Sequence, residues 1–149
     1  MWAVVPSGLP DLLRNHVGYL AVRLGQDART RFESAIGAIG LRAPLFDYLV
    51  ALDERGPCAQ RVIAASLGID AARVVALTDE LSARALVTRS VDRADRRRNV
   101  LALTATGAAL LCHARATAAR VEGELLSGLA PSEQAGLRAL LRRALGIGL

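Results

Sequence analysis

The chain has 149 residues, of which 52% are hydrophobic and 22% charged, which allows one domain with a sizeable, mostly aliphatic core. Its net charge of +5 comes from arginine alone, because the chain contains no lysine. Its apolar runs are too short to span a bilayer, and residues 1–10 lack the basic start of a secretory signal, so we expect a cytoplasmic protein. Two cysteines, Cys58 and Cys112, exclude a disulfide framework.

A long helix is expected near the N-terminus, over residues 11–36. Its apolar residues recur every three or four positions, at Leu13, Val17, Leu20 and Leu24. Pro10 suits a first helical turn, and Gly37 suits the end of the helix. A second helix is expected over 44–52, before the Gly-Pro pair at 56–57.

Residues 58–82 have the pattern of a helix-turn-helix. Ile63, Ala64 and Leu67 mark a short helix that ends at Gly68. Asp70 is a good N-cap for the next helix, whose apolar stripe is Val74, Leu77 and Leu81. Ala59 stands where a capping side chain would precede the first of these helices, so that cap is expected to be missing.

A β-hairpin with a charged tip is expected next. Residues 85–92 (ALVTRSVD) and 99–104 (NVLALT) alternate as strands, and the segment RADRRR joins them. Between residues 84 and 98 there are six arginines against two aspartates, so much of the excess charge is concentrated here. A helix-turn-helix followed by such a hairpin is a winged helix, in which a helix fits the major groove of DNA and the hairpin fits the minor groove.

Two further helices complete the chain. Thr104 is a good N-cap for the first of them, in which apolar residues recur every three or four positions from Leu111 to Leu125. Pro131 opens the last helix, with Leu137, Leu141 and Leu145 on one side.

With these elements the chain resembles the MarR family of winged-helix transcriptional regulators over nearly its full length. The motifs that carry the resemblance are Ile63-Ala64, Leu67-Gly68, Leu81, Leu86-Val87, Asp95-Arg96-Arg97, Leu103-Thr104 and Gly107. The resemblance implies a mainly α fold with a small β-hairpin wing, in a single domain over 1–149. In that domain, helices within 9–40 and 104–149 build a homodimer and residues 41–103 form the DNA-binding lobe. It also implies a pseudo-palindromic operator and release by a small aromatic or acidic ligand.

The resemblance also assigns the DNA-binding residues. The recognition helix is about 71–82, and its groove-facing positions are Ala71, Ala72, Arg73, Val75 and Ala76. Family members commonly carry Ser, Thr or Arg at these positions. Because alanine and valine side chains cannot hydrogen-bond a base, Arg73 is expected to be the main polar reader of bases in this chain. The wing arginines are Arg93, Arg96, Arg97 and Arg98, and Asp95 is expected to orient Arg97. Ala85 replaces the usual Gly before Leu-Val.

Ligand and redox candidates have weaker support. Asn15, His16 and Tyr48 lie in segments that line the ligand cleft in the family, although ordinary packing and surface hydrogen bonds explain them as well. Cys58 lies at the start of a helix, where a thiolate is favoured. It is either a redox switch or, as we prefer, a small packed hydrophobe.

Three classes of function follow from the sequence. The leading hypothesis is a sequence-specific transcriptional regulator, a repressor relieved by a small ligand. The alternative is a helical protein-interaction module that kept the fold but lost operator recognition, as the alanine-rich recognition helix suggests. An enzyme has the least support, because the sequence offers no nucleophile–base pair, metal cluster or phosphate loop, and we expect no cofactor or metal.

Overall fold

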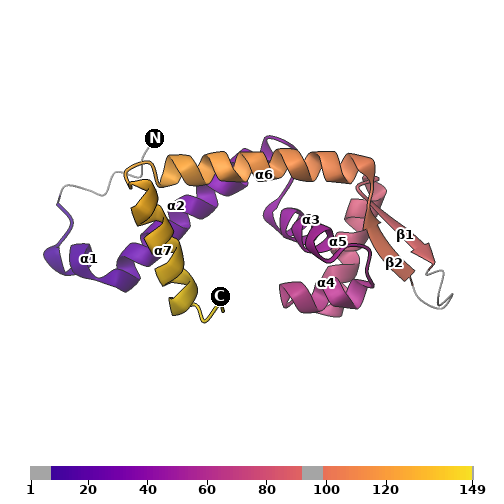
Figure 1. The fold of residues 1–149 in the computed structure, drawn as a ribbon, viewed down its shortest axis with the longest axis horizontal. Helices are drawn as coiled ribbons and strands as arrows, with labels where there is room; N and C mark the ends of the chain where they lie inside the picture. The colour runs from indigo at the N-terminus through magenta and orange to yellow at the C-terminus, as the bar shows by residue number, and fades with distance from the viewer. Residues whose placement is uncertain (1–7, 92–98, 149) are drawn as a thin grey trace. The chain divides into compact units, whose positions relative to one another are not determined.

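The computed structural model describes residues 8–91 and 99–148. Within these ranges the chain is mainly helical with one antiparallel hairpin, which confirms the predicted fold class (Figure 1). The elements are α1 (Asp11–Asn15), α2 (Val17–Gly37), α3 (Ala43–Arg55), α4 (Gln60–Leu67), α5 (Ala71–Ala83), β1 (Val87–Val91), β2 (Asn99–Leu103), α6 (Ala105–Leu125) and α7 (Pro131–Ala144). No helix in the described part is long and apolar enough to cross a membrane.

The chain divides into two compact units. The helical unit comprises described residues 8–31 and 119–148, and the winged unit comprises 32–91 and 99–118. The division falls inside α2 and α6, because Phe32 and Ile36 at one end, and Leu111 and Ala114 at the other, pack in the core of the winged unit. The assignment of residues 41–103 to DNA binding and of the flanking helices to dimerisation stays a prediction.

The core of the winged unit is aliphatic, with one buried tyrosine. Its fully buried large side chains are Ile36, Leu45, Tyr48, Leu49, Leu52, Ile63, Leu81, Leu101 and Leu111. In α5 the residues spaced three and four apart, Val74, Leu77 and Leu81, face this core, as their periodicity predicted. Burial of this stripe fixes which side of α5 faces outward.

The turn between α4 and α5 has the predicted chemistry. Gly68 ends α4 in the left-handed conformation, with φ 62°. The carboxylate of Asp70 accepts a hydrogen bond from the backbone N–H of Arg73 at 2.8 Å and so caps α5. Ala59 precedes α4 without a side-chain cap, as expected.

The hairpin is in register from Val87 opposite Leu103 to Val91 opposite Asn99. Cys58 adds one bridge to β2, because its N–H donates to the carbonyl of Leu101 at 3.1 Å and its carbonyl accepts from the N–H of Leu101 at 2.8 Å. Through this bridge the segment between α3 and α4 is hydrogen-bonded to strand β2 of the wing. The hydroxyl of Thr104 then accepts the N–H of Gly107 at 2.9 Å, which confirms the predicted cap of α6.

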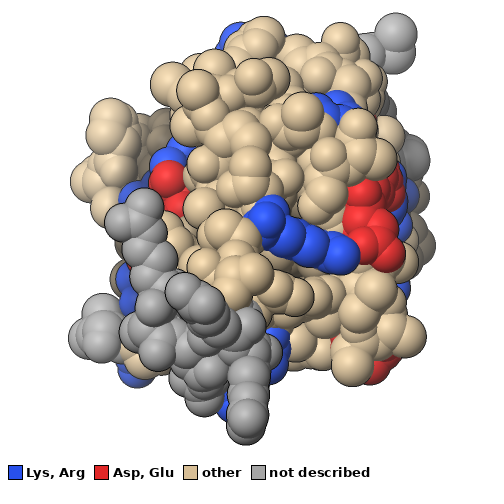
Figure 2. All heavy atoms as spheres, turned by 90° about the vertical axis from the view of Figure 1, so that its right-hand side faces the viewer, with Lys and Arg blue, Asp and Glu red and all other residues tan. Residues whose placement is uncertain are grey.

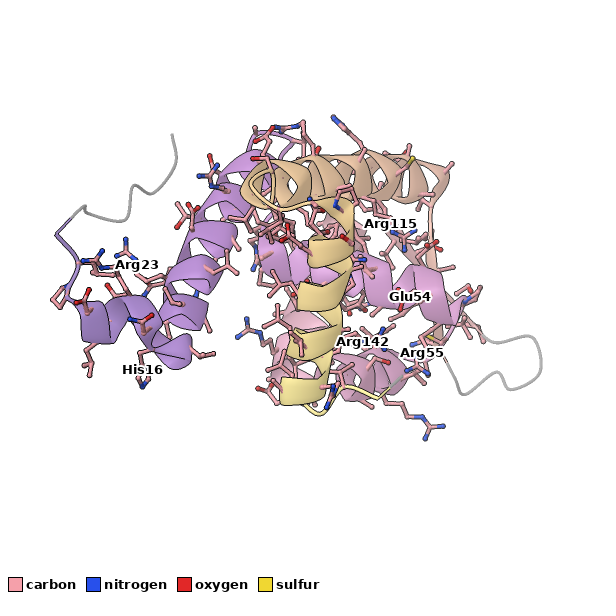
Figure 3. The ribbon with its side chains drawn as sticks, turned by 60° about the vertical axis from the view of Figure 1, so that its left-hand side comes forward. His16, Arg23, Glu54, Arg55, Arg115 and Arg142 are labelled. Atoms are coloured by element: carbon pink, nitrogen blue, oxygen red, sulfur yellow. The ribbon has the colours of Figure 1, made fainter. Side chains whose placement is uncertain are left out.

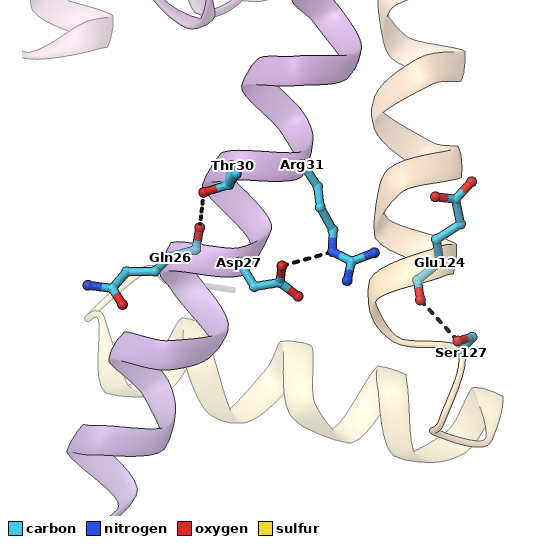
Figure 4. A network of polar contacts seen from close by, with 6 residues as sticks. All are labelled: Gln26, Asp27, Thr30, Arg31, Glu124 and Ser127. Atoms are coloured by element: carbon cyan, nitrogen blue, oxygen red, sulfur yellow. Dashed lines mark hydrogen bonds and ion pairs between the residues drawn. The ribbon is translucent and has the colours of Figure 1, made fainter. Parts of the chain in front are cut away.

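The helical unit differs from the sequence-based expectation at His16. One helix over 11–36 was predicted, but His16 is extended and separates α1 from α2. Its imidazole Nδ1 accepts the N–H of Tyr19 at 3.2 Å, so the histidine caps α2, and its side chain projects outward from the ribbon (Figure 3). Further along α2, Arg31 pairs with Asp27 at 3.0 Å and the hydroxyl of Thr30 donates to the carbonyl of Gln26 (Figure 4).

Candidate nucleic-acid interface

The outward face of α5 is the candidate surface for reading DNA. The five predicted groove-facing residues, Ala71, Ala72, Arg73, Val75 and Ala76, are all exposed, and the side chain of Val75 is 45% exposed. They alternate with the buried stripe, so one helix carries a core face and a free face. We define these five residues as the reading face. Figure 2 views the molecule from the hairpin side, where uncharged side chains cover most of the visible surface.

A buried polar chain holds α5 against α3. The hydroxyl of Thr78 donates to the carbonyl of Val74 at 2.6 Å, so its oxygen accepts the proton of the Tyr48 hydroxyl, also at 2.6 Å. Tyr48 and Thr78 are both fully buried. Because each buried hydroxyl has a partner, the pair links the two helices without an unsatisfied polar atom.

Three charged contacts anchor the last turns of α5, and none of them was predicted. Asp79 forms an ion pair with Arg89 of β1, and Glu80 forms one with Arg42 at the start of α3. Arg84, just beyond α5, donates to the carbonyl of Gly40 at 2.8 Å. The hydrogen bond from Arg42 lowers the pKa of the Glu80 carboxyl, although its small burial opposes this. The recognition helix is therefore tied both to the wing and to the corner between α2 and α3.

The predicted wing residues lie in the segment between β1 and β2. Arg93, Arg96, Arg97, Arg98 and the orienting Asp95 lie outside the described residues, so their roles stay predictions. Of the strands that flank them, β1 ends at Val91 and β2 begins at Asn99.

The three ligand candidates belong to two different units of the chain. Asn15 and His16 are exposed neighbours in the helical unit, and the side-chain amide of Asn15 donates to the carbonyl of Asp11 at 2.9 Å. Tyr48 lies in the interior of the winged unit with its hydroxyl already bonded to Thr78. Burial raises the pKa of Tyr48, so this hydroxyl stays protonated at neutral pH. Tyr48 is thus part of the core of the winged unit, and its role in ligand binding stays a prediction.

Cys58 is half-buried between α3 and α4. Burial raises the pKa of its thiol, and the nearby charge of Arg55 opposes that rise only in part. A reactive cysteine requires a lowered pKa, so the environment of Cys58 fits the packed hydrophobe better than the redox switch. The described residues contain no cluster of His, Cys, Asp and Glu suited to a metal ion.

The helical unit carries an apolar groove of about 360 Å³. Its apolar lining comes from α2, α6, α7 and the residues at their ends, chiefly Leu24, Leu125, Leu126, Leu137, Leu141 and Leu145. No residue of α7 is buried in the single chain, and Leu140 and Leu145 are 62% and 71% exposed. This exposed apolar surface lies in the two segments to which the family resemblance assigns dimerisation.

Comparison with known proteins places these features in context. Residues 39–98, which include the helix-turn-helix and the predicted wing, match the model of the MarR family. The chain is 33% identical over 135 residues to the HTH-type transcriptional repressor NicR of Pseudomonas putida, covering 90% of this chain and 85% of NicR.

Solved structures give the same picture. The structure of Bordetella bronchiseptica BpsR, whose DNA binding is regulated by 6-hydroxynicotinic acid, is 32% identical with a TM-score of 0.74, covering 91% of this chain and 96% of that one. CouR from Rhodococcus jostii RHA1, solved with p-coumaroyl-CoA, is 30% identical with the same TM-score, covering 89% of this chain and 94% of that one.

Proposed function

This chain belongs to the MarR family of transcriptional regulators, and from that premise we propose that it represses transcription by binding a specific DNA duplex in the cytoplasm. α5 enters the major groove and the arginines of the wing lie in the adjacent minor groove. The observation that carries the proposal is the exposed reading face of α5. The opposite side of the same helix is buried in the core, so the reading face points away from the protein. The repressor NicR, similar over 90% of the chain, supports the direction of regulation.

We propose that the active form is a homodimer joined through the helical unit. Eight of the exposed large hydrophobic residues belong to this unit: Leu12, Val17, Leu20, Val22, Leu140, Leu141, Leu145 and Ile147. Two of them, Leu141 and Leu145, also line the apolar groove of this unit. Exposed apolar residues gathered in one unit indicate an interaction site, and a second copy offers the same surface by symmetry. The dimer presents two α5 helices to successive major grooves of a pseudo-palindromic operator, about 34 Å apart.

The proposal includes release of DNA by a small aromatic or acidic ligand. BpsR and CouR, similar in sequence and fold, respond to or bind small molecules of this kind. In this chain Asn15 and His16 remain candidate contacts, because both are exposed at the break between α1 and α2. A ligand that changes the spacing of the two α5 helices away from one helical turn weakens operator binding.

One observation favours a second function, a protein-interaction module. Four of the five residues of the reading face are alanine or valine, and such a surface can dock on a partner protein as well as on DNA. Under this alternative the chain binds a protein tightly and protects no DNA in a footprint.

The test is binding of the purified chain to its own upstream DNA and to random duplex over a salt series. We expect the upstream site to bind at least about 1,000-fold more tightly than random duplex. Equal affinity for both would contradict the proposed function.

Wing docking has its own test in the same assay. Arg97→Ala should weaken binding at every salt concentration and reduce the slope of log K against log salt by about 0.9, the share of one phosphate contact. Arg120→Ala, which removes the same charge from the helical unit, is the matched control and should leave the slope unchanged. Equal slopes for the two variants would count against wing docking.

A further inference from the structure

The reading face is almost free of hydrogen-bonding groups. The side chains of Ala71, Ala72, Val75 and Ala76 are wholly apolar, and Arg73 is the one polar side chain of the face. The exposed acid one turn further on, Asp79, is paired with Arg89, and the exposed Asp70 accepts the N–H of Arg73. What α5 offers to a base edge is thus one guanidinium set among aliphatic groups.

Such a surface selects DNA by a narrow set of contacts. Among the unmodified base pairs, the one apolar group in the major groove is the 5-methyl of thymine. Burying one methyl group against another removes apolar area from water and stabilises the complex. A purine or cytosine edge covered by alanine or valine loses its hydrogen bonds to water and gains none, which disfavours it.

Arg73 supplies the one directional contact. It lies in the first turn of α5, the part of a recognition helix that reaches the base edges. A guanidinium pairs with O6 and N7 of guanine through two donors. The neighbouring Val75 and Ala76 then cover the base pairs next to that guanine.

Resting on the proposed function, we propose that the reading face selects operator half-sites by thymine methyl groups placed around a single guanine that Arg73 contacts. Val75 is the largest apolar residue of the face and makes the principal methyl contact. The ion pair between Asp79 and Arg89 keeps an uncompensated negative charge away from the edge of this surface.

The experiment replaces each thymine of a selected operator, one at a time, by deoxyuridine. This change keeps base pairing and removes only the methyl group. We expect the dissociation constant to rise about fourfold at each contacted thymine, the effect of one buried methyl-sized group, and to stay constant at thymines outside the half-site.

Variants of the protein assign the contact. Val75→Ala should abolish the uridine effect at one thymine position while leaving the melting temperature near that of the parent, because Val75 is exposed. Val91→Ala, which trims an exposed valine of β1, is the matched control and should keep the full uridine effect. If Val75→Ala also keeps it, Val75 does not make the contact.

The outcomes separate the inference from the function on which it rests. If the protein selects a specific site but its dissociation constant changes less than twofold at every uridine substitution in the half-site, methyl reading is wrong. The assignment as a DNA-binding regulator is then unaffected. Failure to select any site over random duplex overturns the proposed function and the inference together.

Discussion

Arg89 on β1 and Asp79 on α5 form an ion pair that joins the first strand of the wing to the recognition helix. Both side chains are partly exposed, so the pair contributes at most about 1 kcal/mol to folding. Its importance is orientation, because α5 and the wing are proposed to lie in neighbouring grooves. Their relative position then decides whether both fit the same duplex.

Asp79→Asn is predicted to lower specificity more than stability. Removing one negative charge should raise affinity for random duplex about twofold to fivefold, while operator affinity stays level or falls because Arg89 is no longer oriented. Fluorescence anisotropy titrations with operator and with random duplex give the two dissociation constants, and their ratio measures specificity. Asp53→Asn makes the same charge change in the exposed pair with Arg115, between α3 and α6, and serves as control. If Asp79→Asn and Asp53→Asn change the ratio of operator to random-duplex affinity equally, the ion pair does not orient Arg89 for DNA binding.

Ala85→Gly is predicted to stabilise the fold. Ala85 has φ 53°, the left-handed conformation that costs a residue with a Cβ about 1 kcal/mol. Glycine relieves this cost at the turn between α5 and β1, so the melting temperature should rise by about 2–4 °C. Ala83→Gly, at the end of α5, should instead lower it, since glycine weakens a helix. A lower melting temperature for Ala85→Gly would contradict the strain at this position.

Gly107→Ala is predicted to disrupt the junction of the wing and α6. A Cβ at Gly107 would lie 2.0 Å from the carbonyl oxygen of Leu86, a backbone atom that cannot move aside cheaply. We expect the free energy of unfolding, measured by chemical denaturation, to fall by more than about 2 kcal/mol. Gly123→Ala, in the same helix and with no atom within 4 Å of the added Cβ, should be neutral or stabilising. Comparable stability of the two alanine variants would refute the close approach.

The contact between Arg42 and Glu80 is predicted to make stability depend on pH in the acid range. The pKa of Glu80 is lowered in the folded chain, so its contribution is complete above the ordinary glutamate pKa and is lost as pH falls through the lowered value. Glu80→Gln should cost up to about 1 kcal/mol at pH 7, and the difference from the parent should shrink toward pH 3. Urea unfolding of the parent and the variant at several pH values measures this difference in unfolding free energy. If the difference is unchanged at pH 3, the ion pair is not its cause.

Local chemistry made the winged unit predictable from sequence. The caps at Gly68, Asp70 and Thr104 use hydrogen bonds to residues within four positions, so these caps follow from the sequence alone. The apolar spacing of α5 likewise specified its buried and exposed faces. The break at His16 was missed because the apolar stripe continues through it, and an imidazole cap leaves no signal in hydrophobic periodicity.

Contacts between distant residues were not predictable in this way. Arg42 and Glu80 are 38 positions apart, and Tyr48 and Thr78 are 30 apart, so their pairing depends on how α3 packs against α5. The resemblance to the family places Tyr48 in a segment that lines the ligand cleft, but it does not give the partner of its hydroxyl. Only the packed core reveals that its hydroxyl faces Thr78.

In the proposed complex, two copies of α5 read one face of a DNA duplex. Dimethyl sulfate footprinting on the selected operator tests it most directly, because the reagent attacks guanine N7 in the major groove. We expect two protected guanines about 10 base pairs apart, one under each Arg73, with protection lost in Arg73→Ala. Protection of a single segment, or the same pattern with Arg73→Ala, would contradict it.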